Sequence, residues 1–261
     1  MDKKYEMLND GCIIINGHKL FRIRALKKFQ TIHGLTVNTG DLGGYIQSEK
    51  NLSQEGYCWV SDNACVCDNA EVFGNAWVSD NAWVFDNAKV FGDACVYGNA
   101  WVFNNAWVFD NAKVFNKTWV FDNAWVFDNA WVYDNTCVFN DACVFNDACV
   151  YGNALVCDNA CVYDDACVFN DAKVGNNADI CNDSDYICIK GLGGISATTF
   201  YKCKDNQIGV TCGFFKGTLD EFISKVESTH KYNKFGKEFF DIVEAVKIHF
   251  CLDKSTSATA I

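Results

Sequence analysis

Valine returns at every sixth position through the middle of this chain. It occupies position 60 and each sixth position up to 174, and Ile180 completes a series of twenty-one units without an insertion. Alanine follows most of these valines by four residues, and a pair drawn from Asp, Asn and Gly lies between them, so the unit is V-x-[DNG]-[ND]-A-x. An α-helix repeats its apolar face about every 3.6 residues, so this period excludes one. The period indicates short strands joined by tight corners, because Asp, Asn and Gly tolerate the left-handed backbone that corners need.

This unit resembles the hexapeptide repeat of left-handed parallel β-helices, in which an aliphatic residue is followed four positions later by a small one. In that family three hexapeptides form one triangular coil, and the coils stack into a solenoid. The resemblance therefore implies three sides, a left-handed winding and about seven coils over residues 58–181. Capped solenoids of this type are familiar among bacterial and phage-encoded proteins, so the resemblance also implies such an origin.

The N-terminal part, residues 1–57, is predicted to be a β cap followed by an imperfect first coil. Ile46 and Leu52 keep the spacing of six, but two extra residues precede Val60. Upstream, the stretch CIIINGHKLFRIRAL predicts a hairpin with its turn at Asn16-Gly17. We expect this part to cover the open end of the solenoid, where strand edges would otherwise be unpaired.

The C-terminal part, residues 182–252, is predicted to be a small α+β domain, followed by a frayed tail at 253–261. Thr218 and Glu221 have the spacing of a capping box at the start of the first helix. The Gly-rich stretch GLGGIS lacks the Lys of a phosphate-binding loop and is predicted to be a turn. The fold class expected for the whole chain is mainly β, a left-handed parallel β-helix with a small α+β domain. The apolar patterns place strands at 186–191, 198–204 and 208–215, and helices at 218–231 and 237–250.

Aromatic residues flank the valines. All eight Trp of the chain lie directly before a valine, and Phe or Tyr follows many of the valines directly. A strand that buries its valine turns both neighbours outward, and residues eighteen apart share a side of the coil, so each side is predicted to carry ladders of stacked rings. The candidate interface consists of ten of these residues on two sides: Trp83, Phe85, Trp101, Phe103, Trp119, Phe121, Trp107, Phe109, Trp125 and Phe127.

Such ladders form a larger apolar surface than a soluble monomer usually exposes. We therefore expect at least one side to be covered by a second copy of the chain, by another protein or by the end domains. The alternative is a set of ladders whose rings pack against one another and tolerate water.

Composition limits the possible partners and location. The net charge of −11 argues against direct binding to nucleic acid. The first residues, MDKKYEMLND, lack the apolar core of a signal peptide, and no apolar run is long enough to cross a membrane. Many of the sixteen Cys occupy slots that other units give to Trp or Phe, and some are stacked one coil apart, as Cys143 with Cys161 and Cys149 with Cys167. We interpret them as packed thiols of a cytoplasmic protein.

No catalytic residue, cofactor or metal ligand is predicted. In many hexapeptide-repeat acyltransferases a His between subunits acts as a general base, but the four His of this chain, at positions 18, 33, 230 and 249, lie outside the repeats. The repeat region also carries 17 acidic residues against four Lys. Columns of carboxylates can mimic DNA or hold Ca²⁺, although Asp is also what a tight corner requires.

The function expected from the sequence is that of a non-enzymatic binding or scaffold protein. It would be a rigid solenoid with aromatic sides that forms a homo-oligomer, binds another protein, or does both. One alternative is an acyl- or nucleotidyl-transferase-like enzyme of the hexapeptide-repeat class. The other is an acidic mimic of nucleic acid that inhibits a DNA-binding protein.

Overall fold

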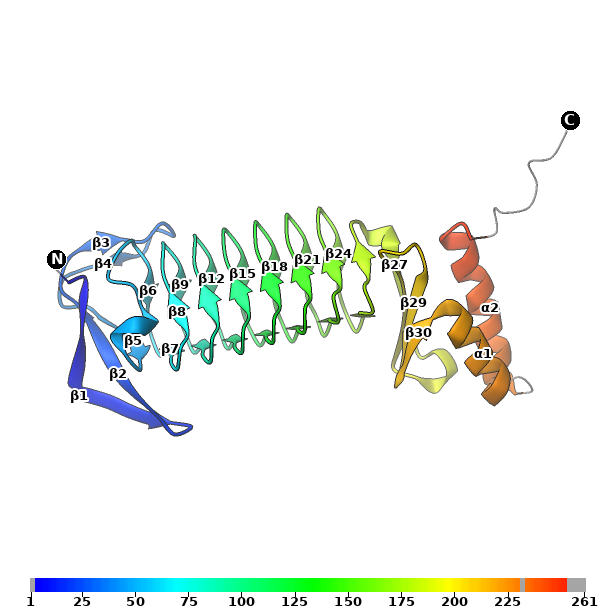
Figure 1. Cartoon of the computed structure of the whole chain (residues 1–261), viewed down its shortest axis with the longest axis horizontal. Coiled ribbons are helices and arrows are strands. Elements are labelled where there is room, and N and C mark those ends of the chain that lie inside the picture. The colour runs from blue at the N-terminus through cyan, green and yellow to red at the C-terminus, as the bar shows by residue number, and fades with distance from the viewer. Residues whose placement is uncertain (1–2, 231–232, 253–261) are drawn as a thin grey trace, which may run out of the picture.

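A computed structural model describes residues 3–230 and 233–252. The predicted tail at 253–261 lies outside these residues. The described chain forms a long parallel β-solenoid with a β cap at its N-terminal end and an α+β unit at its C-terminal end (Figure 1). Among the described residues, no helix is both long and apolar enough to cross a membrane.

Short strands one coil apart pair in parallel and build three sheets along the solenoid. We call these sheets face 1, face 2 and face 3. Face 1 contains β7 (Cys65–Val66), β10 (Trp83–Val84), β13 (Trp101–Val102), β16 (Trp119–Val120), β19 (Cys137–Val138), β22 (Leu155–Val156) and β25 (Lys173–Val174). Face 2 contains β8 (Glu71–Val72), β11 (Lys89–Val90), β14 (Trp107–Val108), β17 (Trp125–Val126), β20 (Cys143–Val144), β23 (Cys161–Val162) and β26 (Asp179–Ile180). Face 3 contains β6 (Trp59–Val60), β9 (Trp77–Val78), β12 (Cys95–Val96), β15 (Lys113–Val114), β18 (Trp131–Val132), β21 (Cys149–Val150) and β24 (Cys167–Val168).

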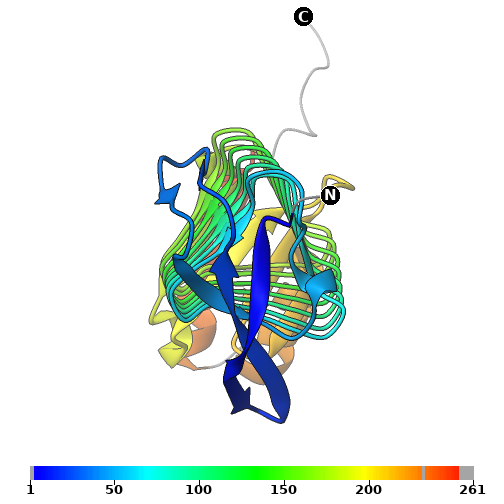
Figure 2. The same ribbon diagram turned by 90° about the vertical axis from the view of Figure 1, so that its left-hand side faces the viewer.

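The register confirms three sides of six residues each. Val66 pairs with Val84 and Val84 with Val102, so each valine lies over the one eighteen residues away. Seen from the N-terminal end, the coils superpose along the axis (Figure 2). The repeat valines and alanines fill the interior and are buried with almost no exposure, as the sequence predicts.

The corners use the left-handed backbone that the Asp, Asn and Gly residues permit. The first residue of the polar pair has φ of 56° at Asp62, 55° at Asp68 and 55° at Asp128, and Gly takes the same place at Gly92 and Gly98. A left-handed residue at each corner redirects the chain by one side. The predicted corner chemistry is therefore confirmed.

The N-terminal cap continues the sheet of face 1. Strands β1 (Tyr5–Ile15) and β2 (His18–Ala25) form the predicted hairpin, and β2 pairs with β5 (Leu42–Ile46). Ile46 pairs with Val66 and Leu52 with Val72, so these two residues begin the imperfect first coil. The other elements of the cap are β3 (Phe29–Gln30), β4 (Thr36–Val37) and the short turn η1 (Glu49–Asn51).

A buried lysine closes part of the N-terminal end of the solenoid. Lys4 is 1% exposed, and its Nζ donates hydrogen bonds to the carbonyl oxygens of Cys58 at 2.9 Å and Glu55 at 3.2 Å. These carbonyl groups satisfy a cation that water does not reach.

The C-terminal unit packs an antiparallel sheet between the solenoid and two helices. The sheet order is β27 (Tyr186–Lys190), β28 (Ala197–Lys202), β29 (Ile208–Cys212) and β30 (Phe215–Thr218), and the helices are α1 (Leu219–His230) and α2 (Lys234–His249). Successive residues of β28 face opposite ways: Tyr201 packs on the solenoid core, and Phe200 packs on the core beneath the helices. The short turns η2 (Asp183–Asp185) and η3 (Leu192–Gly194) precede β27 and β28, and η3 lies in the predicted GLGGIS turn.

The predicted bounds in this unit differ from the observed ones by one or two residues, apart from two larger differences. The run predicted as one strand at 208–215 is interrupted by a tight turn at Gly213 and Phe214, where Gly213 has φ of 60°, and continues as β30. Helix α2 begins at Lys234 rather than 237, because Asn233 caps it by accepting a hydrogen bond from the Gly236 N–H at 3.0 Å.

Candidate functional site

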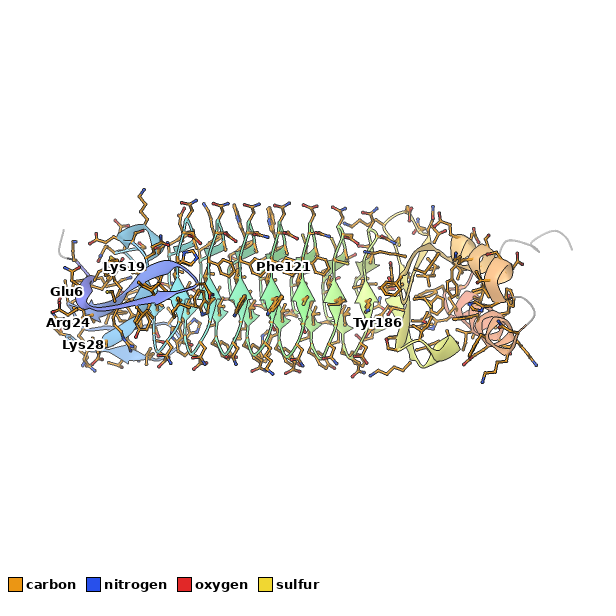
Figure 3. All side chains as sticks on the ribbon, turned by 90° about the horizontal axis from the view of Figure 1, so that it is seen from below. Glu6, Lys19, Arg24, Lys28, Phe121 and Tyr186 are labelled. Carbon is orange, nitrogen blue, oxygen red and sulfur yellow. The ribbon has the colours of Figure 1, made fainter. Side chains whose placement is uncertain are left out.

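The outward positions of the solenoid carry continuous columns of stacked rings. On face 2, rings that follow the valines stack with centroids 4.8–5.1 Å apart and planes within 5° of parallel. Faces 1 and 3 carry similar columns, and Figure 3 shows side chains recurring in rows from coil to coil, with Phe121 labelled. The face 2 column consists of Phe73, Phe91, Phe109, Phe127, Phe145 and Tyr163.

A second column of tryptophans lies beside the phenylalanines on faces 1 and 2. The indole rings of Trp101 and Trp119 stack at 5.6 Å, and those of Trp107 and Trp125 stack at 5.4 Å. Each indole also meets a Phe of the other column edge to face, as Phe103 meets Trp119 at 6.5 Å. The structure thus brings the ten predicted interface residues into two ladders, one on face 1 and one on face 2.

Stacking leaves most rings half-buried and turns their edges toward solvent. Among the described residues of the repeat region, the exposed large apolar side chains are Trp119, Trp125 and Trp131, which are 44%, 42% and 42% exposed. They lie on the three faces of one coil. The next coil places Cys137, Cys143 and Cys149 against them in register. A small thiol cannot cover an indole, so one surface of each Trp stays open. The candidate interface predicted from the sequence omits Trp131. The sequence does show that Trp is followed by Cys one coil later at all three of these tryptophans, which is the signal of their exposure.

The end cap covers the first coils of two faces. On face 1, Trp83 and Phe85 pack in a cluster with Leu20 of the hairpin. On face 3, Trp59 is 2% exposed beneath Phe29. The end domains therefore provide part of the expected cover, and the ladders around Trp119 and Trp125 lie beyond it.

His33 of the N-terminal cap also packs on face 3. Its ring stacks on Trp77 at 6.1 Å, and its Nε2 lies 3.2 Å from Cys95 Sγ. Burial lowers the pKa of His33.

The corner acids are linked to one another along the solenoid. Asn105 Nδ2 donates to Asn123 Oδ1 at 3.2 Å, and Asn123 Nδ2 donates to Asp141 Oδ1 at 3.1 Å. A parallel ladder on another corner joins Asn111, Asn129 and Asp147 at 3.1 Å per step. Because Asn amide groups donate to these carboxylates, the corner acids act first as structural acceptors.

The sixteen cysteines all lie among the described residues and are free thiols. One of the stacked pairs has unusual electrostatics: a hydrogen bond from Cys143, with a smaller effect of Lys204, lowers the pKa of the Cys161 thiol to about 6. The same hydrogen bond raises the pKa of Cys143. Cys161 is thus the thiol of this pair that ionises first.

The four histidines lie in separate surroundings in the described structure. His18 begins β2 over face 1, and His33 lies over face 3. His230 ends α1, and His249 ends α2 with its Nε2 2.8 Å from the Ser184 carbonyl oxygen.

Sequence reasoning missed one cluster that involves a histidine. His18, Cys67 and Asp68 come together where the hairpin meets the first corner of face 1. Burial and the Asp68 carboxylate raise the pKa of the Cys67 thiol to about 12. His18 is separated from the other two residues by about fifty positions, and only the hairpin turn at Asn16-Gly17 hints at where its side chain lies.

No protein-family model matches this sequence, and no curated protein matches it.

Proposed function

We propose that this protein is a non-enzymatic binding or scaffold protein. It pairs with a second copy of itself through the aromatic ladders of face 1 or face 2, and the same surfaces bind other proteins. The observation that carries the proposal is the exposure of Trp119 and Trp125 on an otherwise closely stacked ladder. Large rigid aromatic rings on a rigid support are typical anchors of protein interfaces, because they lose little conformational freedom on binding.

Burial of these rings would supply the pairing energy. Covering an exposed indole removes roughly 100 Å² of apolar surface from water, at about 25 cal/mol per Å², and covering a half-buried ring removes less. Four rings on each of two copies, for example Trp101, Phe103, Trp119 and Phe121, contribute several kcal/mol after the cost of ordering. Two-fold symmetry favours contact between like faces, because each ladder then meets its own copy.

We also propose that the solenoid is of the left-handed hexapeptide-repeat type. An eighteen-residue coil with an inward aliphatic residue and a small residue four positions later supports the left-handed hexapeptide-repeat type. That resemblance carries with it a bacterial or phage origin. Free thiols packed among the aromatic columns are consistent with a reducing compartment, and we place the protein in the cytoplasm.

The test compares the same substitution on different faces of one coil. Trp119→Lys and Trp125→Lys change the proposed surfaces, and Trp131→Lys changes an equally exposed Trp on face 3, outside them. Lysine is compatible with this slot, because Lys89 and Lys113 occupy it in other coils.

Native mass is measured by light scattering coupled to size exclusion, and folding by circular dichroism. We expect the Trp119→Lys/Trp125→Lys double variant to have a lower native mass than the wild type and an unchanged β spectrum. Trp131→Lys is expected to keep the wild-type mass. An unchanged mass in the double variant, or an equal loss in Trp131→Lys, contradicts the proposed surface.

A further inference from the structure

We propose that His18, Cys67 and Asp68 form a binding site for a divalent transition-metal ion of the zinc type, located where the N-terminal hairpin meets the solenoid. One ligand atom from each residue lies within 4.8 Å of the other two. The site is separate from the exposed tryptophans and does not depend on the proposed function.

The distances suit a tetrahedral ion. His18 Nδ1 lies 3.3 Å from Asp68 Oδ1, and Cys67 Sγ lies 3.7 Å from Asp68 Oδ2. Zinc bonds of about 2.0–2.3 Å at tetrahedral angles separate neighbouring ligand atoms by about 3.3–3.7 Å. The two distances end on different oxygens of Asp68, so a rotation of its carboxylate is needed for one oxygen, the imidazole and the thiolate to share an ion.

Local structure fixes each ligand. The Asn16-Gly17 turn, with φ of 52° and 86°, makes His18 the first residue of β2 and directs the hairpin along face 1. Leu20 of β2 packs against Cys65 and Cys67. In Figure 3 the hairpin overlies the first coils in the region of the labelled Lys19.

The corner holds the carboxylate from the other side. Asp68 has left-handed backbone, and its N–H donates to Gln47 Oε1 at 2.7 Å. The Asp86 N–H, one coil on, approaches Asp68 Oδ2 at 3.4 Å. The first bond fixes the backbone of Asp68, and the second orients its carboxylate before any ion arrives, as supporting groups do in other metal sites.

The donor set selects the class of ion. A thiolate and an imidazole favour zinc and its first-row neighbours over Ca²⁺ and Mg²⁺, which prefer oxygen ligands. Cys67 is buried, whereas the side chains of His18 and Asp68 are each 29% exposed. An ion can therefore enter from solvent on the His18 side, and water can complete its coordination. Once bound, the ion links β2 to the first corner of face 1.

The experiment uses the full-length reduced protein, freed of metal with a chelator and titrated with Co²⁺, a spectroscopic substitute for Zn²⁺. We expect one Co²⁺ per chain and a near-ultraviolet thiolate-to-cobalt charge-transfer band, which added Zn²⁺ removes. His18→Gln and Asp68→Asn should each weaken binding about tenfold or more, and Cys67→Ser should abolish the band. Asn fits the corner, because Asn104 and Asn140 adopt the same left-handed backbone in this column.

Three control variants separate this site from other thiols and acids of the chain. Cys65→Ser removes a neighbouring thiol, Cys161→Ser removes the readily ionised thiol of face 2, and Asp122→Asn removes an acid farther along the same corner column. All three are expected to bind Co²⁺ as the wild type does. Circular dichroism checks folding, and His18→Gln provides the test if Cys67→Ser is misfolded. A wild type without a thiolate band, or a band that persists in His18→Gln and Asp68→Asn with unchanged affinity, overturns the proposal.

Discussion

Replacing the inward-facing Val126 with Asp provides the sharpest test of how the coil is assembled. Val126 is fully buried and lies in register between Val108 and Val144 on face 2. The substitution removes a valine burial of about 1.5–3 kcal/mol. It also buries a carboxyl group without a partner, at a cost of about 1–3 kcal/mol even if the group becomes protonated. We therefore expect a destabilisation of about 3–6 kcal/mol and a melting temperature lower by about 10 °C or more.

Two controls lie within two residues of Val126. Trp125→Asp changes the adjacent outward side chain and loses one indole stack, at a cost of about 1 kcal/mol. Acids already occupy this slot on face 2, at Glu71 and Asp179. Asp128→Asn keeps a residue that tolerates the left-handed corner, so it should change stability by less than about 0.5 kcal/mol.

Thermal and urea unfolding followed by circular dichroism measure all three variants. The expected order of destabilisation is Val126→Asp, then Trp125→Asp, then Asp128→Asn. If Val126→Asp unfolds like the wild type, or Trp125→Asp is equally harmful, the assignment of valine to the interior and of aromatics to the exterior is wrong.

Three further predictions concern the ends of the solenoid, its thiols and the histidine that stacks on Trp77. A fragment of residues 58–181 loses the pairing of β5 with β7 and the hydrogen bond from the Lys173 N–H to Thr199 Oγ1. It should therefore keep a β spectrum in circular dichroism but associate end to end through its unpaired edges. A monomeric fragment would refute the capping role of the two end domains. Because the pKa of Cys161 is lowered to about 6 whereas that of Cys149 is raised, iodoacetamide at pH 7 should modify Cys161 faster than Cys149. Mass spectrometry of peptides measures both rates, and equal rates would contradict an ionised Cys161 thiol. Burial lowers the pKa of His33, so the unfolded chain binds its proton more tightly and stability is lost as the pH falls below about 6.5. His33→Gln should reduce this loss in urea unfolding between pH 7 and 5, and an unchanged pH profile would contradict the assignment.

Much of the solenoid follows from the sequence because its physics is local and repeated. The strict spacing of valine defines which side chains enter the core, and the Asp, Asn and Gly pairs place the corners. The hairpin turn and the cap of α1 are equally local: Glu221 Oε2 accepts from the Thr218 N–H at 2.9 Å, and Thr218 Oγ1 accepts from the Glu221 N–H at 3.3 Å.

The parts that escape prediction depend on contacts between distant segments or on single residues inside apolar runs. Gly213 interrupts an apolar run and creates β30, and a lone Gly gives a weak signal in such a run. The hairpin covers the first coils of face 1 through packing of Leu20, which no periodicity reveals. The approach of His18 to Asp68 follows from that packing and was therefore invisible in the sequence.

The native mass of the wild-type protein tests the central claim most directly. Light scattering coupled to size exclusion, over a range of concentrations and together with tryptophan fluorescence, reports both association and the environment of the indoles. The proposal predicts a mass at least twice the 29.2 kDa of one chain, and a blue shift of the emission as concentration rises. A mass of one chain at every concentration, with emission typical of water-exposed tryptophan, would contradict self-association through the aromatic faces.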